Sequence, residues 1–161
     1  MAKVKVRRAR RGDSEQFLSL LGELARFEKL EPPSEEAKSR ILRDVFDKDK
    51  LRLVIAEVGE EPVGYALYFY TYSSFLARPT LYLEDLYVKE GHRREGAGMA
   101  LFSWCAREAL AERCGRMEWA VLRWNQKAAK FYESLGARKL DEWEVFRLDE
   151  ERLGALVRRS D

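Results

Sequence analysis

A glycine-bearing run between a predicted strand and a predicted helix is the first segment that could do chemistry. It reads RREGAG, from Arg93 to Gly98. Glycines there let a ligand approach the backbone without meeting a Cβ atom, and the free N–H groups that open the helix attract anions. The run lacks the Lys–Ser/Thr of an NTPase phosphate loop and the spacing of a dinucleotide fingerprint. It therefore predicts a site for a pyrophosphate group, with Arg93 and Arg94 adding positive charge.

The elements that must position this run follow from hydrophobic periodicity and from turn residues. Strands are expected at residues 4–6, 51–58, 63–72, 81–88, 117–123 and 145–148. Helices are expected at residues 14–29, 41–46, 98–113 and 126–135, with a short one at the C-terminal end. Hairpins come first and helical connections later, which indicates a mixed α/β (or α+β) sheet in one domain, residues 1–161.

Composition excludes several classes of protein. The chain has 161 residues, of which 46% are apolar and 36% charged, with a net charge of +2. This is too much core material for a disordered chain, and no run reaches the ~20 apolar residues of a membrane span. A cytoplasmic protein without a membrane or nucleic-acid partner is expected, although the arginines at 7, 8, 10 and 11 could grip phosphates if they were not a solvated strand end. Cys105 and Cys114 have no metal-ligand spacing, so no metal is expected.

A second segment, WNQKAAKFYESLGA at residues 124–137, strengthens the interpretation of the first. An R-x-x-G-x-G run after a strand, followed about thirty residues later by N-x-x-A-x-x-x-Y-x-x-x-G-A, resembles the Gcn5-related N-acetyltransferase superfamily. Three further runs resemble its spermidine/spermine (diamine) branch, which includes thialysine acetyltransferases. They are LARFE at 24–28, LYLEDLYV at 81–88 and W-x-x-F-x-x-D at 143–149. The resemblance covers the chain from Met1 to about Arg152.

The resemblance implies a fold, a cosubstrate and a set of site residues. The sheet would have six to seven strands, splayed between the fourth and fifth, with four to five flanking helices, acetyl-CoA in the opening and a homodimer as the assembly. Cofactor-binding positions carried over from the family are Leu86, Tyr87, Val88, Arg93, Arg94, Glu95, Gly96, Ala97, Gly98, Met99, Asn125, Gln126, Lys127 and Ala128. Acceptor-binding positions are Phe27, Glu28, Glu84, Asp85, Asp141 and Trp143. Tyr132 matches the general acid and Glu84 the base.

Two departures from the branch concern the acceptor and the loop. Glycine is usual where Arg94 stands, and tyrosine is usual where Phe27 stands, so that an acceptor-side hydroxyl is missing here. The nature of the acceptor is therefore less constrained than the reaction. A polyamine, a diamine or a lysine analogue such as thialysine is favoured, while a protein or peptide amino group and a non-catalytic CoA-binding module remain alternatives.

The chemistry of these residues agrees with the roles that the resemblance implies. An alkyl amine of pKa ~10.4 is protonated at pH 7, and exposing its lone pair costs about 4 to 5 kcal/mol. Glu84, in an apolar strand that could raise its pKa, could accept that proton directly or through a water. Unpaired N–H groups of the same strand could stabilise an oxyanion, and the Tyr132 phenol could protonate a leaving thiolate.

Each of these residues also has a purely structural interpretation. Glu84 and Asp85 could form ion pairs at a sheet edge, and Tyr132 could be a core aromatic on the helix 126–135. Asn125 could serve as a helix N-cap with or without a ligand. The aromatic side chains of the strand 63–72 could pack the sheet or line an acceptor pocket.

Overall fold

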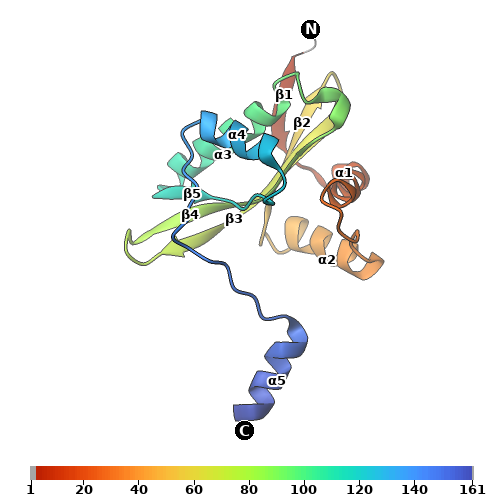
Figure 1. The fold of residues 1–161 in the computed structure, drawn as a ribbon. Coiled ribbons are helices and arrows are strands. Elements are labelled where there is room, and N and C mark those ends of the chain that lie inside the picture. The colour runs from red at the N-terminus through yellow and green to blue at the C-terminus, as the bar shows by residue number, and fades with distance from the viewer. Residues whose placement is uncertain (1–2, 161) are drawn as a thin grey trace. The chain divides into compact units, whose positions relative to one another are not determined.

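The computed structural model describes residues 3–160, which form five strands, five α-helices and two short 3-10 turns (Figure 1). The strands are β1 (Val4–Arg8), β2 (Arg52–Val58), β3 (Glu61–Ser73), β4 (Arg78–Val88) and β5 (Arg116–Glu118). The helices are α1 (Ser14–Phe27), α2 (Glu35–Phe46), α3 (Ala97–Ala111), α4 (Gln126–Ser134) and α5 (Glu150–Ser160). The chain divides into two compact units, here called the N-terminal unit, up to Ala120, and the C-terminal unit, from Val121.

One sheet organises the N-terminal unit, with its strands in the order β1-β2-β3-β4-β5. The first four strands pair antiparallel and the last pair is parallel. Strand β5 pairs with β4 only from Thr80 to Tyr82, whereas β4 continues to Val88. The expected splay between the fourth and fifth strands is therefore present, because the far half of β4 runs on past the end of its ladder with β5.

Helices cover both faces of this sheet (Figure 1). Helix α3 packs on one face through Ala97, Leu101, Cys105 and Ala109, all buried against apolar side chains of β2, β3 and β4. Helix α1 packs on the other face through Phe17, Leu20 and Leu24, with partly buried residues of α2 beside it. Phe17, Leu24 and Ala25 share one face of α1, and all three are buried.

A β-bulge in β4 changes which face its side chains occupy. Leu67 of β3 pairs with Asp85 and Tyr68 pairs with Leu83, so Glu84 is an extra residue without a cross-strand partner. Before the bulge, Leu83 packs on the α3 face; after it, Tyr87 packs on the α1 face. Strict alternation would put Asp85 on the side of Leu83, but the extra residue moves it to the side of Tyr87.

The arginine cluster near the N-terminus takes part in ion pairs. The guanidinium of Arg7 donates two hydrogen bonds of 2.8 Å to Asp13 and one of 2.5 Å to Glu57. Arg8 pairs with Glu108 and Arg11 pairs with Asp47. Asp13, expected as a helix N-cap, occupies that position, but its carboxylate binds Arg7 and the backbone N–H of Arg10 instead of the helix. The Arg7 guanidinium holds the pKa of Asp13 below its usual value.

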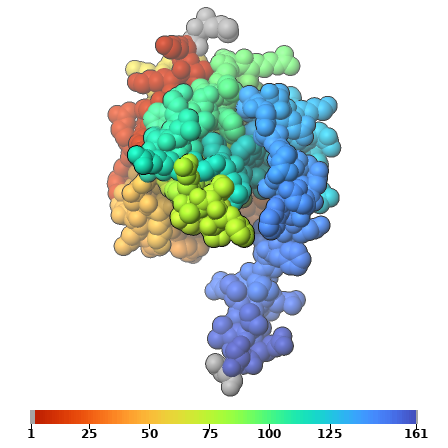
Figure 2. All heavy atoms as spheres, turned by 90° about the vertical axis from the view of Figure 1, so that its left-hand side faces the viewer, coloured from red at the N-terminus to blue at the C-terminus, as the bar shows by residue number. Residues whose placement is uncertain are grey.

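The β3–β4 hairpin ends in an apolar tip. Phe75 is fully exposed there, and Tyr72 and Leu76 are also exposed. Figure 2 shows this segment, in yellow-green, on the surface that faces the viewer. A Cβ added at Gly115 would lie 2.8 Å from Leu76 Cδ1, the end of an exposed side chain that can move aside.

The C-terminal unit contains α4 and α5 joined by an extended segment. The side chain of Asn125 accepts a hydrogen bond of 3.2 Å from the Ala128 N–H, which confirms it as the N-cap of α4. Gly136 follows the helix with φ +92°, as expected for a residue that ends it. The prediction of a single domain over residues 1–161 stays a prediction.

One strand prediction was wrong and another was too long, and the described residues contain five strands where six to seven were expected. The strand expected at 117–123 ends at Glu118, and residues 145–148 form no strand. Val145 and Phe146 are 93% and 91% exposed, so their apolar, β-favouring side chains pack against no sheet in the part of the chain described. Side-chain preference alone does not make a strand, because its stability comes from neighbours on the pleated surface. Within residues 3–160, no helix is both long and apolar enough to cross a membrane.

Candidate active site

The predicted anion site lies at the start of α3. Gly96 is the N-cap residue and has φ +86°, a conformation that favours glycine. The described side chains supply no capping hydrogen bond to this helix end, and its first turn carries no acidic residue. A 15-residue helix thus opens with uncapped N–H groups and the positive end of its dipole. This arrangement suits an anion such as pyrophosphate.

Two glycines near the end of β4 differ in how much space they leave for a side chain. A Cβ added at Gly98 would lie 3.9 Å from the Val88 side chain, which is ordinary contact. A Cβ at Gly64, which pairs with Val88 across the sheet, would lie 2.6 Å from the Tyr87 carbonyl oxygen, so this position needs glycine. Sequence analysis did not single out Gly64, although an isolated glycine inside a strand is a signal for close backbone approach.

The end of β4 next to this loop offers backbone groups on one edge. Leu86, Tyr87 and Val88 pair with Ala66, Tyr65 and Gly64 of β3 on the other edge. The ladder with β5 stops at Tyr82, so a ligand lying along residues 86–88 would meet peptide groups without a β5 partner. This is the geometry that the acetyl and pantetheine positions would require.

The two loop arginines differ in their surroundings. The Arg93 Nε donates a hydrogen bond of 3.0 Å to the Val88 carbonyl oxygen. Its guanidinium carbon lies 4.9 Å from the centre of the Phe27 ring and 5.7 Å from that of Tyr87. Arg94 is exposed, and Glu95 contacts His92 at 2.7 Å. The sequence predicts that Arg93 binds the pyrophosphate. It does not predict that Arg93 stacks on Phe27, which lies 66 positions earlier in the chain.

Three carboxylates gather on the α1 face of the sheet. Glu28 is the C-cap residue of α1, while Glu84 and Asp85 follow each other at the bulge of β4. Burial raises the pKa of Glu28, and the charge of Glu84 adds to that rise. The pKa of Asp85 is raised to about 6, chiefly by burial and further by Glu84 and Glu28. A raised pKa at Asp85 was not expected from the sequence; this carboxyl is less exposed than Glu84, the residue beside it.

A buried tyrosine holds Asp85 in place. The Tyr65 hydroxyl donates a hydrogen bond of 3.0 Å to Asp85 Oδ2, which opposes the rise in its pKa. The Tyr65 ring is fully buried and meets Phe17 of α1 edge to face, with ring centres 5.1 Å apart. The aromatic side chains of the strand 63–72 were expected either to pack the sheet or to line an acceptor pocket. The hydrogen bond from Tyr65 to Asp85 was not expected. Neither Glu84 nor Asp85 forms the edge-strand ion pair considered above with any described partner.

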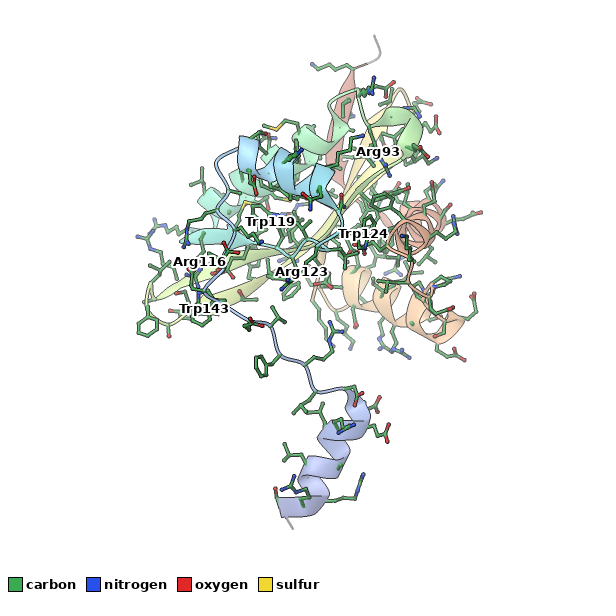
Figure 3. All side chains as sticks on the ribbon, in the orientation of Figure 1. Arg93, Arg116, Trp119, Arg123, Trp124 and Trp143 are labelled. Carbon is green, nitrogen blue, oxygen red and sulfur yellow. The ribbon has the colours of Figure 1, made fainter. Side chains whose placement is uncertain are left out.

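The remaining predicted site residues belong to the C-terminal unit. Tyr132 lies on α4, half-buried, with its ring centre 5.3 Å from that of Phe131. Asp141 pairs with Lys139 at 3.3 Å, and Trp143, labelled in Figure 3, is exposed. Of the cofactor positions there, Gln126 and Lys127 are exposed while Asn125 and Ala128 form the helix cap. Their roles at the site stay predictions.

The structure thus brings together two groups of predicted residues within the N-terminal unit. The anion-binding loop adjoins the end of β4, and the carboxylates collect around the bulge of the same strand. Among residues 3–160, no set of three or more His, Cys, Asp or Glu side chains is arranged to hold a metal ion. The chemistry available is that of an uncapped helix end, an open strand edge and a cluster of three carboxylates.

Comparisons with known proteins agree with this arrangement. Residues 16–137 match the Acetyltransferase (GNAT) family. The chain is 36% identical to a thialysine N-epsilon-acetyltransferase of Sus scrofa, over 98% of this chain and 99% of the relative. It is 33% identical to the spermidine/spermine N(1)-acetyltransferase-like protein 1 of Homo sapiens, over 92% of this chain and 23% of that protein. An integron cassette protein from the mobile metagenome of V. cholerae has the same fold, with a TM-score of 0.83 at 24% identity, covering 98% and 99% of the two chains.

Proposed function

The chain belongs to the acetyltransferase (GNAT) family and is an acetyl-transferring enzyme, and on this premise we propose that it acetylates a small cationic amine. Acetyl-CoA is the cosubstrate of the family and supplies the activated acetyl group as a thioester. The observation that carries the choice of acceptor is the cluster of Glu28, Glu84 and Asp85 on the α1 face. Three carboxylates in mutual repulsion are stabilised by a cation placed among them.

The cosubstrate fits the features at the other end of β4. Its pyrophosphate would lie on the N–H groups of residues 96–99, where the helix end is uncapped, and its pantetheine arm along residues 86–88. Arg93, Arg94 and Glu95 complete the loop, and residues 125–128 of the C-terminal unit are proposed as the remaining cofactor edge. Transfer is direct, because both ligands are then held on one strand at the same time.

The residues proposed for chemistry are Glu84 and Tyr132. Glu84 is exposed at the bulge, so that its carboxylate can accept a proton from the incoming ammonium directly or through a water. The nitrogen then forms a bond to the acetyl carbon, and the sulfur–carbon bond breaks. The departing thiolate takes its proton from the Tyr132 phenol, and the second proton that the nitrogen loses as the amide forms returns to the Tyr132 oxygen. Asp85 and Glu28 bind the ammonium, with Phe27, Asp141 and Trp143 as further acceptor positions.

Similarity to the relatives favours thialysine, a diamine or a polyamine as the acceptor, because one relative is named for thialysine and another for spermidine and spermine. All are flexible chains with at least two cationic or amine groups, which suits separate carboxylates for binding and for proton transfer. A homodimer and a cytoplasmic location, both expected from sequence, form part of this proposal. Sedimentation of the pure protein tests the dimer.

A thiol-release assay tests the proposal. The wild type is incubated with acetyl-CoA and, separately, spermidine, a short diamine, thialysine and a lysine-containing peptide. We expect turnover with at least one of the first three and a fall in kcat of about 10² or more for Glu84→Gln. Glu60→Gln, an exposed glutamate in the β2–β3 turn, is the matched control and should leave kcat unchanged. Turnover of the peptide alone would replace the small amine by a protein acceptor.

A further inference from the structure

Arg93 makes three contacts that are unusual for a residue in an anion-binding loop. Its Nε donates to the Val88 carbonyl oxygen at 3.0 Å. Its guanidinium carbon lies 4.9 Å from the Phe27 ring centre and 5.7 Å from that of Tyr87, within the range of cation–π attraction. Burial raises the pKa of Tyr87, and the positive charge of Arg93 opposes that rise. The side chain, labelled in Figure 3, is thereby attached to α1 and β4 as well as to its own loop.

These contacts join the two halves of the proposed site. Phe27 is the last residue of α1, and Glu28, one of the three clustered carboxylates, follows it directly. Tyr87 and Val88 end β4, which carries Asp85 at its bulge. Arg93 itself lies three positions before Gly96, the N-cap of the anion-binding helix. If the end of α1 moves, the Phe27 ring moves with it, and this ring contacts Arg93 in the loop before α3.

We propose that Arg93 is a positioning residue that couples acceptor binding to cosubstrate binding by stacking on Phe27. This rests on the proposed function, since it takes the carboxylate cluster as the acceptor site and the start of α3 as the pyrophosphate site. A cation bound between Glu28 and the β4 carboxylates draws the end of α1 toward β4. The Phe27 ring then stays on Arg93, which keeps the loop in the shape that an anion requires.

Coupling of this kind is reciprocal. If the amine tightens coenzyme A binding by some factor, coenzyme A tightens amine binding by the same factor. A single cation–π contact at an exposed site supports a factor of about two to five. Tyrosine at position 27 would keep an aromatic ring for Arg93 to stack on. Leucine would keep most of the apolar volume but would remove the ring. Phe27→Leu and Phe27→Tyr therefore separate stacking from simple packing.

The first measurement needs no ligand. Amide hydrogen exchange of residues 94–99 is followed in the free wild type, Phe27→Leu, Phe27→Tyr and Arg93→Met. We expect exchange in this segment to accelerate about two- to fivefold in Phe27→Leu and Arg93→Met and to stay at the wild-type rate in Phe27→Tyr. Equal exchange in all four proteins would show that the stacking does not support the loop, and the proposal would be overturned whatever the enzyme acetylates.

The second measurement is the dissociation constant of coenzyme A with and without a saturating amine. Coenzyme A carries no acetyl group, so the ternary complex does not react. The amine used is the one that the wild type acetylates fastest in the assay above. We expect coenzyme A to bind about two- to fivefold more tightly with the amine present, and this ratio to fall to one in Phe27→Leu but not in Phe27→Tyr.

Arg94→Met is the matched control for charge. It removes a neighbouring loop arginine that is exposed, so it should weaken coenzyme A binding while leaving the ratio as in the wild type. A ratio of one in the wild type, or an unchanged ratio in Phe27→Leu, overturns the coupling and leaves the proposed function standing. Failure of every amine to be acetylated overturns the proposed function, and the coupling with it.

Discussion

Replacing Asp85 by asparagine is expected to stabilise the protein at neutral pH. The pKa of Asp85 is raised from 3.8 to about 6, mainly because its carboxylate is buried and also because Glu84 and Glu28 lie close. An asparagine has nearly the same shape and can still accept the Tyr65 hydrogen bond through its side-chain oxygen. The variant therefore removes a buried charge and keeps an acceptor for the Tyr65 hydroxyl.

The sign and size of the effect follow from proton linkage. Between pH 4 and pH 6 the folded protein holds the Asp85 proton more tightly than the unfolded chain does, so the free energy of unfolding falls as pH rises through this window. A shift of about two pKa units corresponds to about 3 kcal/mol. Above pH 6 the penalty is complete. We expect the free energy of unfolding of Asp85→Asn to exceed that of the wild type by about 1 to 3 kcal/mol at pH 7, and the two to differ little near pH 4.

Urea unfolding from pH 4 to pH 7.5 measures this difference. Asp141→Asn is the control, because Asp141 is exposed and pairs only with the exposed Lys139 among the described residues, so its replacement should change the free energy of unfolding little. In the thiol-release assay, Asp85→Asn should raise the KM for the amine, since a binding charge is lost. A stability difference that is the same at every pH would refute the assignment of a raised pKa to this carboxyl.

Four further outcomes are expected. Glu28→Gln should raise the KM for diamines and polyamines about tenfold with a smaller change in kcat, measured by steady-state kinetics. Tyr132→Phe should lower kcat by about 10² to 10⁴ while calorimetry shows unchanged coenzyme A affinity. Gly96→Ala should cost about 1 to 2 kcal/mol of stability because of its positive φ, and should weaken coenzyme A binding further, by thermal scan and calorimetry. Asp13→Asn should lower the free energy of unfolding at pH 7. The pKa of Asp13 is lowered in the folded protein, so the stability that its carboxylate contributes is present above pH 4 and is lost as the pH falls below it. Urea unfolding at pH 7 and pH 3 should therefore show a smaller loss of stability on acidification in the variant than in the wild type.

The order of helices and strands could be predicted from the sequence because local signals agree with the fold. The helices at 14–29 and 126–135 end within two residues of α1 and α4, and the long strands 63–72 and 81–88 are β3 and β4. Each has a periodic apolar face and a glycine, asparagine or proline near an end. Such signals act on the backbone within a few residues and do not depend on distant contacts. The element at 145–148 has only the apolar pattern, and no strand formed.

The bulge at Glu84 could not be predicted with the same reasoning. In LYLEDLYV the apolar residues on the α3 face are Leu81 and Leu83 and then Leu86 and Val88, so a spacing of three residues interrupts a spacing of two. This shift is a signal for an inserted residue, but Tyr82 and Tyr87 are also apolar and hide it. A register change of one residue moves a side chain to the opposite face, so the location of Asp85 depended on it.

The contacts of Tyr65 and Arg93 lay beyond the sequence for a different reason. Tyr65 of β3 donates to Asp85 of the adjacent strand β4, and Arg93 stacks on Phe27, which lies 66 positions earlier in the chain. No periodicity relates such pairs, because their distance depends on how the sheet and helices pack. The residue types could be assigned to the site from motifs, but the identity of the carboxyl with the elevated pKa required burial to be known.

Strand β4 separates the charges of the two proposed ligands along its length. At ~3.3 Å per residue, Glu84 and Val88 lie roughly 13 Å apart, with the anion-binding loop beyond Val88. This exceeds the Debye length of ~8 Å at physiological ionic strength, so the carboxylates repel the pyrophosphate only weakly across solvent. A cation at the bulge and an anion at the start of α3 can therefore be bound together without either site cancelling the other. The energetic connection between them then depends on contacts rather than on bulk electrostatics, and Arg93 on Phe27 is one that the structure provides.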